Sequence, residues 1–490
     1  MPRVIVIGAG CAGLTAAVAA ARAGAEVAVI SKTAAEVASC TVCSAGIFSL
    51  ACGGVDQREQ FKKILSTGRG INDRKLLSVL TEESLKTMAE LESWGVTVKY
   101  RKGTASVRRT AKNPLLGGSG MTAELISAAK KCGVKFIEWS AAREIVVRNG
   151  RACGVSVTDW RAGKHEAICA DAVVLATGGA GRVYSNTDNP ARITGDGYAL
   201  ALEAGLSLRD MEFVQFYPIG WAQEGFPMWM CDASLGDFVP ITDSNGEEFI
   251  HEAYERWGVK NGVECNYLAR DKLAVLMAEK DRDGGAYAHI ESTTGEMWQN
   301  RDFLYAVSMP PSFFEDIKTP LRVAPLEHYF CGGVKIGTNC ETAVDGLYAC
   351  GEVTGGIDGA NRMGGNALMH SVTFGVRAGR AAASHPSGAQ YSFVPKDAIK
   401  DMSVNGRSVT DARRELQAKA WRSIGPIRRA EEIQTFLNYL QTLKTEKWSA
   451  RTPFELLQIL EMTGLIASAE AVGKAALKRR ESVGSHYIVA

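Results

Sequence analysis

Three glycines near the N-terminus could hold a phosphate group. Gly8, Gly10 and Gly13 form a G-x-G-x-x-G motif between the apolar run 4–7 and an Ala-rich segment. Such glycines permit a tight turn, a close approach of a pyrophosphate and close packing of the following helix on the strand. Amides at that helix N-terminus favour an anion. The motif predicts dinucleotide binding, and the alternative is a Gly-rich packing turn.

The residues that would hold the rest of a dinucleotide are less typical. An acidic residue usually ends the second strand of such a unit and binds the ribose, but Ser31 and Lys32 stand there. Ser31 can still form a hydrogen bond, and Lys32 could reach a phosphate. Two later segments also combine an apolar strand with a Gly-rich turn, at 172–179 and 346–368. We therefore predict a nucleotide domain that is closed by a distant segment.

The elements that must position these residues indicate an α/β fold. The β-α-β unit spans strand 3–7, a helix to about 23 and strand 26–30. A loop is expected at 33–54, helices at 73–94 and 120–132, and a β-rich stretch at 134–175. Residues 221–324 mix Trp, Pro and charge irregularly and predict an inserted α+β capping lobe. Helical spacing covers 407–482. The expected domains are a discontinuous Rossmann-like domain (1–220 with 325–385), the cap (221–324) and a C-terminal helical domain (396–490).

Composition excludes several classes of protein. The formal net charge of the 490-residue chain is +2, which gives no sign of a nucleic-acid surface. No run of 18 uncharged apolar residues is present, so no transmembrane segment is expected and a cytoplasmic location is the default, with a peripheral seat in a membrane complex left open. The 12 cysteines are dispersed and suggest reduced thiols. Cys40 and Cys43 form the sole C-x-x-C, so no metal site is predicted.

Several longer strings resemble one family. They are VIGAGCAGL near the start, VVLATGGAGRVY from Val173, TGDGYA from Thr194, MEFVQFYP at 211–218, YLARDK at 267–272, HYFCGGV from His328, GLYACGEV at 346–353, GANRMGGNAL at 359–368 and RRESVGSHY near the end. In this order, over essentially the whole chain, they resemble the flavoproteins of the fumarate reductase / succinate dehydrogenase / L-aspartate oxidase family. That resemblance implies an FAD domain, a capping domain over the flavin and a helical C-terminal domain.

The resemblance also implies which residues contact FAD. The covalent flavin histidine of membrane-type relatives falls near Cys40, so we expect non-covalent FAD. The expected contacts, some through backbone alone, are Gly8, Gly10, Cys11, Ala12, Gly13, Ser31, Lys32, Ser39, Thr41, Ala45, Gly46, Ala176, Thr177, Gly178, Asp196, Glu352, Arg362, Asn366, Ala367 and Leu368.

The implied chemistry is hydride transfer between flavin N5 and a carbon of an α,β-unsaturated or saturated carboxylic acid. By the same resemblance, His328 and Arg362 clamp one substrate carboxylate, which suits the donors of imidazole and guanidinium. Arg270 matches the proton-transfer residue. An arginine needs a relay that reprotonates it, because its pKa lies above about 12. The alternative for Arg270 is a surface ion pair with Asp271.

The chain departs from the family at the other end of the substrate. Tyr217-Pro218-Ile219 replaces the usual His-Pro-Thr, and segment 230–237 lacks the usual relay residues. These changes put fumarate and succinate in doubt. Tyr217 and Asp232 resemble the urocanate-reductase branch, in which the substrate carries an imidazole, and Asp232 is otherwise a solvated loop acid. Asp232, Asp237 and Glu252 are the candidates for a replacement relay.

The electron partner is expected to be a separate molecule. There is no second strand–G-x-G-x-x-G–helix unit for a nicotinamide and no iron–sulfur or haem motif. An iron–sulfur subunit, a quinone or a diffusible carrier would then exchange electrons with the flavin. The competing hypothesis is a non-catalytic or electron-relaying flavoprotein subunit of a larger redox complex.

Overall fold

The computed structural model describes residues 1–37, 39–108, 116–387, 393–395 and 402–489. A parallel five-stranded sheet of order β18-β10-β1-β2-β6 forms its centre. Its strands are β1 (Arg3–Ile7), β2 (Glu26–Ile30), β6 (Lys135–Ile137), β10 (Ala172–Leu175) and β18 (Leu347–Ala349). The near-continuous apolar strands suit a parallel sheet covered on both faces. The predicted β-α-β unit is confirmed, with α1 (Cys11–Arg22) between β1 and β2.

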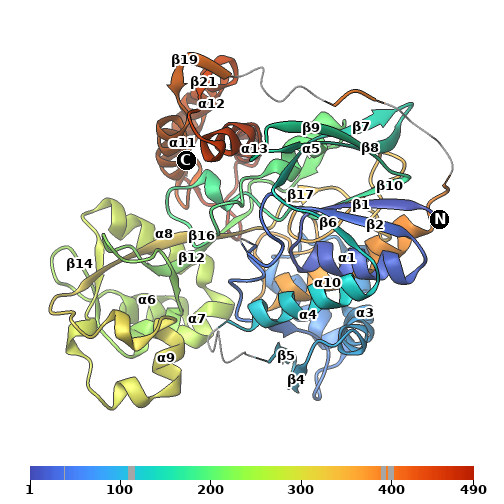
Figure 1. The fold of residues 1–490 in the computed structure, drawn as a ribbon. Coiled ribbons are helices and arrows are strands. Elements are labelled where there is room, and N and C mark those ends of the chain that lie inside the picture. The colour runs from blue at the N-terminus through green and yellow to red at the C-terminus, as the bar shows by residue number, and fades with distance from the viewer. Residues whose placement is uncertain (38, 109–115, 388–392, 396–401, 490) are drawn as a thin grey trace.

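Helices cover one face of this sheet and a second sheet covers the other (Figure 1). The helices are α1, α4 (Gly117–Lys131) and α10 (Asn366–Ala383), with α2 (Gln57–Thr67) and α3 (Arg74–Ser93) outside them. The second sheet is antiparallel and consists of β7 (Ser140–Arg148), β8 (Arg151–Asp159) and β9 (Lys164–Cys169). A small sheet of β3 (Ile47–Ser49), β4 (Val98–Arg101) and β5 (Thr104–Val107) lies in the N-terminal part. The presence of β3 shows that the loop prediction for 33–54 was wrong in that short stretch.

Two glycines let α10 lie directly against α1. A Cβ on Gly375 would lie 2.1 Å from Thr15 Oγ1, and one on Gly379 would lie 2.1 Å from the Ala16 carbonyl oxygen. The spacing of four places both glycines on one helix face, which brings the two backbones together. The distant segment predicted from the sequence therefore closes the first domain.

Residues between β12 and β16 form a lobe with its own core (Figure 1). Its sheet has the order β13-β12-β16-β15-β14, and helices of the same segment pack around it. The bounds are β12 (Val214–Trp221), β13 (Met230–Cys231), β14 (Ile241–Asp243), α6 (Ile250–Trp257), α7 (Gly262–Leu268), α8 (Arg270–Arg282), β15 (Ala286–Ala288), α9 (Arg301–Val307) and β16 (Leu321–Phe330). This separate core supports the proposed boundaries of a capping domain.

The C-terminal part is mainly helical, as expected. It contains β19 (Met402–Ser408), α11 (Val409–Ile424), β20 (Arg428–Arg429), α12 (Ala430–Thr445), β21 (Trp448–Ser449), α13 (Pro453–Lys478) and β22 (Ile488–Val489). The start of the expected domain, 396–401, lies outside the described residues. Within the described chain, α13 is long and apolar enough to cross a membrane, but 72% of its most apolar window is buried inside the protein. It packs on α5 (Asp196–Glu203), close to the paired strands β11 (Leu208–Arg209) and β17 (Gly333–Val334).

Candidate functional site

One cavity of ≈ 1030 Å³ runs from the carboxyl ends of the central strands to the capping lobe. A crevice at the carboxyl ends of parallel strands is the usual ligand site of such sheets. The predicted site residues line this cavity, with the exception of Gly13 and Asn366, which are buried behind it. The structure thus brings together residues that are hundreds of positions apart in the sequence.

The first turns of two helices offer an anion site at one end of the cavity. No side chain caps α1 at Gly10 or α10 at Gly365. The Cys11 amide donates to Thr41 Oγ1 at 3.0 Å, whereas the Ala12 amide has no partner among the described residues. Free amides and the positive ends of helix dipoles favour a phosphate.

The glycines of the motif are required by the close approach of backbone segments. Gly8 has a φ of +115°, and a Cβ there would lie 2.2 Å from the Ala176 carbonyl oxygen. A Cβ on Gly13 would lie 1.9 Å from the Gly8 carbonyl oxygen. These contacts fit the packing roles that the motif assigns to its glycines. The cradle therefore fits a dinucleotide.

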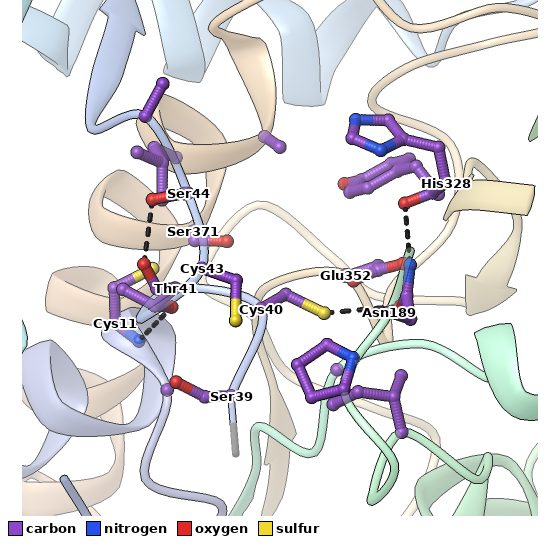
Figure 2. Close-up of a pocket in the computed structure, with 18 of the residues that line it drawn as sticks. Cys11, Ser39, Cys40, Thr41, Cys43, Ser44, Asn189, His328, Glu352 and Ser371 are labelled. Carbon is purple, nitrogen blue, oxygen red and sulfur yellow. Dashed lines mark hydrogen bonds between the residues drawn. The ribbon is translucent and has the colours of Figure 1, made fainter. Parts of the chain in front are cut away.

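Several thiols line the same cavity (Figure 2). The Cys40 thiol donates to Asn189 Oδ1 at 3.2 Å, and Cys43 follows one turn later. Burial raises the pKa of Cys40 well above its ordinary value, and the nearby acids Glu352 and Asp188 raise it further. A thiol of raised pKa is a poor nucleophile, which supports the proposal that FAD is held without a bond to Cys40.

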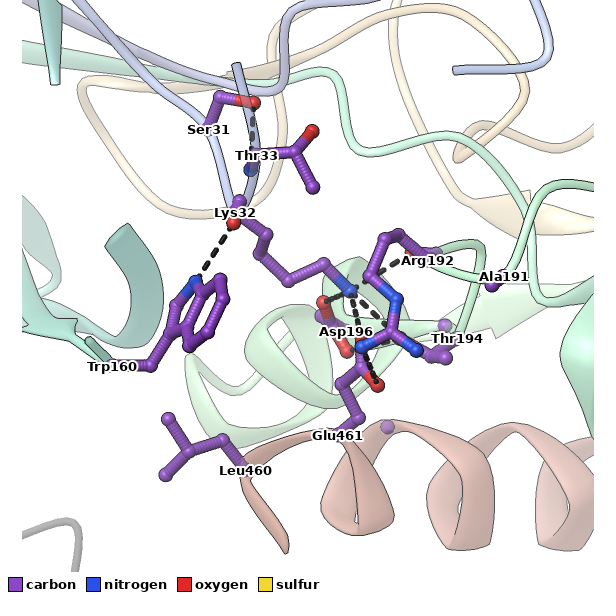
Figure 3. Close-up of polar contacts among 12 residues, drawn as sticks. Ser31, Lys32, Thr33, Trp160, Ala191, Arg192, Thr194, Asp196, Leu460 and Glu461 are labelled. Carbon is purple, nitrogen blue, oxygen red and sulfur yellow. Dashed lines mark hydrogen bonds and ion pairs between the residues drawn. The ribbon is translucent and has the colours of Figure 1, made fainter. Parts of the chain in front are cut away.

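Lys32 is held by carboxylates from distant segments (Figure 3). Its ammonium lies 2.6 Å from Asp196 Oδ2 and 2.9 Å from Glu461 Oε1 and also donates to Thr194 Oγ1 at 2.8 Å. Arg192 and Arg413 pair with the other oxygen of Glu461. Lys32 lines the cavity, but its donors are engaged with protein partners, so the geometry favours a structural role over a phosphate contact.

Arg270 is a buried cation in the cavity wall. Its side chain comes from the first residue of α8, is 7% exposed, and places Cζ 5.1 Å from the Tyr217 ring centroid. Its Nε has no hydrogen-bond partner, and no ion pair to it is found among the described residues. Asp271 pairs with Arg69 at 2.8 Å instead, so the alternative of an Arg270–Asp271 surface pair is wrong. A buried, unpaired guanidinium favours an anionic ligand.

Two further donors face the same space. The Arg362 guanidinium lies 4.5 Å from the Tyr329 ring centroid, and its buried Nε also lacks a partner among the described residues. His328 Nδ1 lies 2.8 Å from Asp188 Oδ2, which leaves Nε2 for the cavity. The His328 ring meets the Tyr217 ring edge to face at 5.3 Å. This arrangement can bind a carboxylate beside Arg270.

Asp232 is a buried, fully bonded acid. Its Oδ1 accepts from the Ser234 amide at 3.0 Å and the Ser234 hydroxyl at 2.7 Å. Its Oδ2 accepts from the Tyr217 hydroxyl at 3.2 Å and from Asn266 Nδ2 at 2.8 Å. Asp232 is 5% exposed, so its interpretation as a solvated loop acid is wrong. Burial and the Asp232 charge together raise the pKa of Tyr217 well above its ordinary value.

The other two relay candidates lie away from the cavity. Asp237 accepts from the Gly262 amide at 3.0 Å, and exposed Glu252 pairs with Arg256 at 3.0 Å. Neither lines the cavity. Sequence reasoning also missed Asp188 in an irregular segment and Asn266 in α7, because a single polar residue carries no recognisable pattern.

Comparison with known protein families assigns the cofactor. Residues 3–368 match the family described as FAD binding domain, and residues 413–488 match the one described as fumarate reductase flavoprotein C-term. The chain belongs to the fumarate reductase / succinate dehydrogenase / L-aspartate oxidase family of FAD-dependent flavoproteins. It is therefore an FAD-dependent oxidoreductase, and the cradle described above fits a dinucleotide of this kind.

Individual relatives cover the whole chain. The fumarate reductase flavoprotein subunit of Mycobacterium tuberculosis is 28% identical, covering 99% of this chain and 91% of the relative. L-aspartate oxidase of Streptomyces coelicolor is 30% identical, covering 99% of this chain and 88% of the relative. A structure of FrdA from E. coli quinol fumarate reductase is 26% identical with a TM-score of 0.84, covering 100% of this flavoprotein and 91% of that chain. These matches confirm the three-part fold expected from the sequence.

Proposed function

We propose that this flavoprotein transfers a hydride between FAD and an α,β-unsaturated carboxylic acid or its saturated counterpart. The observation that carries the proposal is the pair of buried guanidiniums, Arg270 and Arg362, whose Nε atoms lack partners in the cavity that also holds the FAD cradle. Buried polar groups are rarely left unpaired, so two such groups in one cavity indicate an anionic ligand.

Residues of the chain would bind the substrate carboxylate and transfer the proton. When bound, the reduced flavin would supply a hydride from N5 for reduction, and the oxidised flavin would accept one for the reverse reaction. Arg362 and His328 bind the carboxylate, and Asp188 holds the imidazole with Nε2 toward the substrate. Arg270 holds a proton at the carbon next to the carboxylate. No described side chain hydrogen-bonds Arg270, so we propose that water entering the cavity returns this proton.

The second candidate function is electron transfer without substrate reduction. It is supported by the lack of a described side chain that could return a proton to Arg270. A flavoprotein subunit that only passes electrons would need no proton path to Arg270. Similar solved structures include quinol fumarate reductase, so a quinone or a protein partner is a reasonable source or acceptor of electrons. An iron–sulfur subunit or a diffusible carrier remains part of the proposal, together with a cytoplasmic or membrane-peripheral location.

Anaerobic stopped-flow spectroscopy tests the two functions. The bound flavin is photoreduced and mixed separately with acrylate, cinnamate, urocanate, fumarate and iminosuccinate. We expect fast reoxidation by at least one of them, and Arg270→Gln should slow it by about 10²–10⁴-fold, the usual contribution of a proton-transfer group. Arg322→Gln is the control, because Arg322 is exposed and pairs with Asp281 outside the cavity. If no acid reoxidises the flavin, the electron-relay function is favoured.

A further inference from the structure

An aromatic wall extends the cavity beyond the reacting groups. Five further side chains line the same cavity as Arg270. They are Trp229 just before β13, Val263 and Tyr267 on α7, and Leu304 and Tyr305 on α9. Val263, Tyr267 and Tyr305 are 54%, 60% and 54% exposed. Trp229 packs against the core of the capping lobe, whereas Val263, Tyr267 and Tyr305 are not part of that core. Tyr305 and Tyr217 line the same cavity. Burial and Asp232, with a smaller contribution from Tyr305, raise the pKa of Tyr217.

Asp232 offers no free hydrogen-bond acceptor to a substrate group. A carboxylate offers about four acceptor positions. The amide and hydroxyl of Ser234, the Tyr217 hydroxyl and the Asn266 amide occupy them. Because the Tyr217 hydroxyl donates to Asp232, the Tyr217 ring is fixed in place between His328 and Arg270. The acid therefore shapes the wall and leaves no acceptor free for the substrate.

The wall also offers little to a second carboxylate. Among the described residues of the capping lobe that line the cavity, Arg301 is the one Arg or Lys besides Arg270. Arg301 is exposed at the start of α9, and Asp302 beside it lines the same cavity. An exposed cation next to an acid binds an anion weakly, because solvent and the neighbouring charge screen it.

We propose that this wall is a binding subsite for a hydrocarbon aromatic ring on the substrate, so that the preferred acid is a 3-phenyl-2-enoate. The inference rests on the proposed function, since the carboxylate must lie on Arg362 and His328 for the aryl group to reach the wall. Tyr and Trp faces pack favourably against an aromatic ring, edge to face or offset. A small dicarboxylate would leave the wall unfilled.

Substrate competition in the holoenzyme tests the subsite. With the flavin photoreduced, we expect cinnamate to show a kcat/KM at least about tenfold above those of acrylate, fumarate and urocanate, as aromatic burial would give. The double variant Tyr267→Ala/Tyr305→Ala should remove this preference and leave acrylate unchanged. Tyr100→Ala is the matched control, because Tyr100 is an exposed tyrosine of β4 that does not line the cavity. Preference for fumarate or urocanate, or an equal loss for cinnamate and acrylate, would overturn the subsite.

A binding measurement separates this inference from the reaction itself. The oxidised holoenzyme is titrated with 3-phenylpropanoate and with propanoate, followed by the flavin absorbance. Tighter binding of the phenyl compound in the wild type, lost in the double variant, supports the subsite even if no enoate reoxidises the flavin. Equal affinities in the wild type would refute the subsite even if acrylate is reduced quickly.

Discussion

Arg270 and Arg362 differ from Arg413, another buried arginine, in what surrounds their charge. Arg413 is equally buried, but its guanidinium lies 2.7 Å from Glu461. Arg270 and Arg362 each lie on an aromatic face, by Tyr217 and Tyr329, which holds the cation without neutralising it. The aromatic support keeps the positive charge available for a ligand.

Glu352 makes the stability of the apoprotein depend on pH. Burial raises its pKa to about 7, although the Phe330 amide and Arg362 lower it. Between the ordinary and the raised pKa value, the folded state keeps a proton that the unfolded state loses. The free energy of unfolding should therefore fall as pH rises from about 4.5 to 7, and Glu352 should contribute roughly 3 kcal/mol to this fall. Urea unfolding of apoprotein at several pH values, with Glu352→Gln beside the wild type, measures this fall.

The Glu352→Gln variant tests whether the fall in stability comes from Glu352. Burial also raises the pKa of Glu327 well above its ordinary value, so Glu327 contributes to the same trend. Glu352→Gln should therefore lessen the fall in stability without abolishing it. An unchanged slope in the variant would show that Glu352 is ionised in the folded state throughout this range.

At the scale of elements, the sequence predicted those strands, turns and helices whose signals lie within a short stretch of chain. The strand 3–7, its glycines and the helix after them were visible because apolar period and turn chemistry are local signals. Arg270, His328 and Arg362 were found because they lie in long family strings. The Lys32–Glu461 contact was missed, since 429 positions separate the two and a single Glu in an apolar helix gives no hint of its partner. The filled bonding of Asp232 was equally invisible, because it depends on Asn266 in another helix.

That missed contact predicts how firmly α13 is attached. Lys32, Arg192 and Arg413 surround Glu461, whose side chain is 1% exposed. Burial alone would raise the pKa of Glu461, but these three cations lower it. Glu461→Gln should lower stability by about 3–5 kcal/mol, the usual effect of breaking a buried charge network. Thermal unfolding measured by circular dichroism, together with the temperature of flavin release, would show it.

The control for this experiment is an exposed pair of the same kind. Glu252→Gln breaks the ion pair with Arg256, in which both side chains are largely exposed. Its effect should stay below about 1 kcal/mol. Equal effects of the two variants would mean that α13 is held by its apolar contacts alone.

At the scale of the whole molecule, the cavity proposed to hold the cofactor is lined by segments of the first domain and of the capping lobe. We predict that acid precipitation of the holoenzyme releases all FAD into the supernatant, because burial and nearby acids raise the pKa of Cys40 well above its ordinary value and keep the thiol protonated. Absorbance of the supernatant and of the washed pellet measures this directly. Flavin that stays in the wild-type pellet but is released from Cys40→Ser would show a thioether bond and contradict the prediction.

Because α1 packs on α10, α1 cannot complete its packing at the ribosome until α10 has been synthesised. About 340 residues separate the end of α1 from the start of α10. At translation rates of about 5–20 residues per second, the Ala-rich helix α1 lacks its contact with α10 for roughly 20–70 s. During that interval the nascent chain exposes an apolar helix face and an incomplete nucleotide cradle, so chaperone binding to the N-terminal third should precede flavin capture.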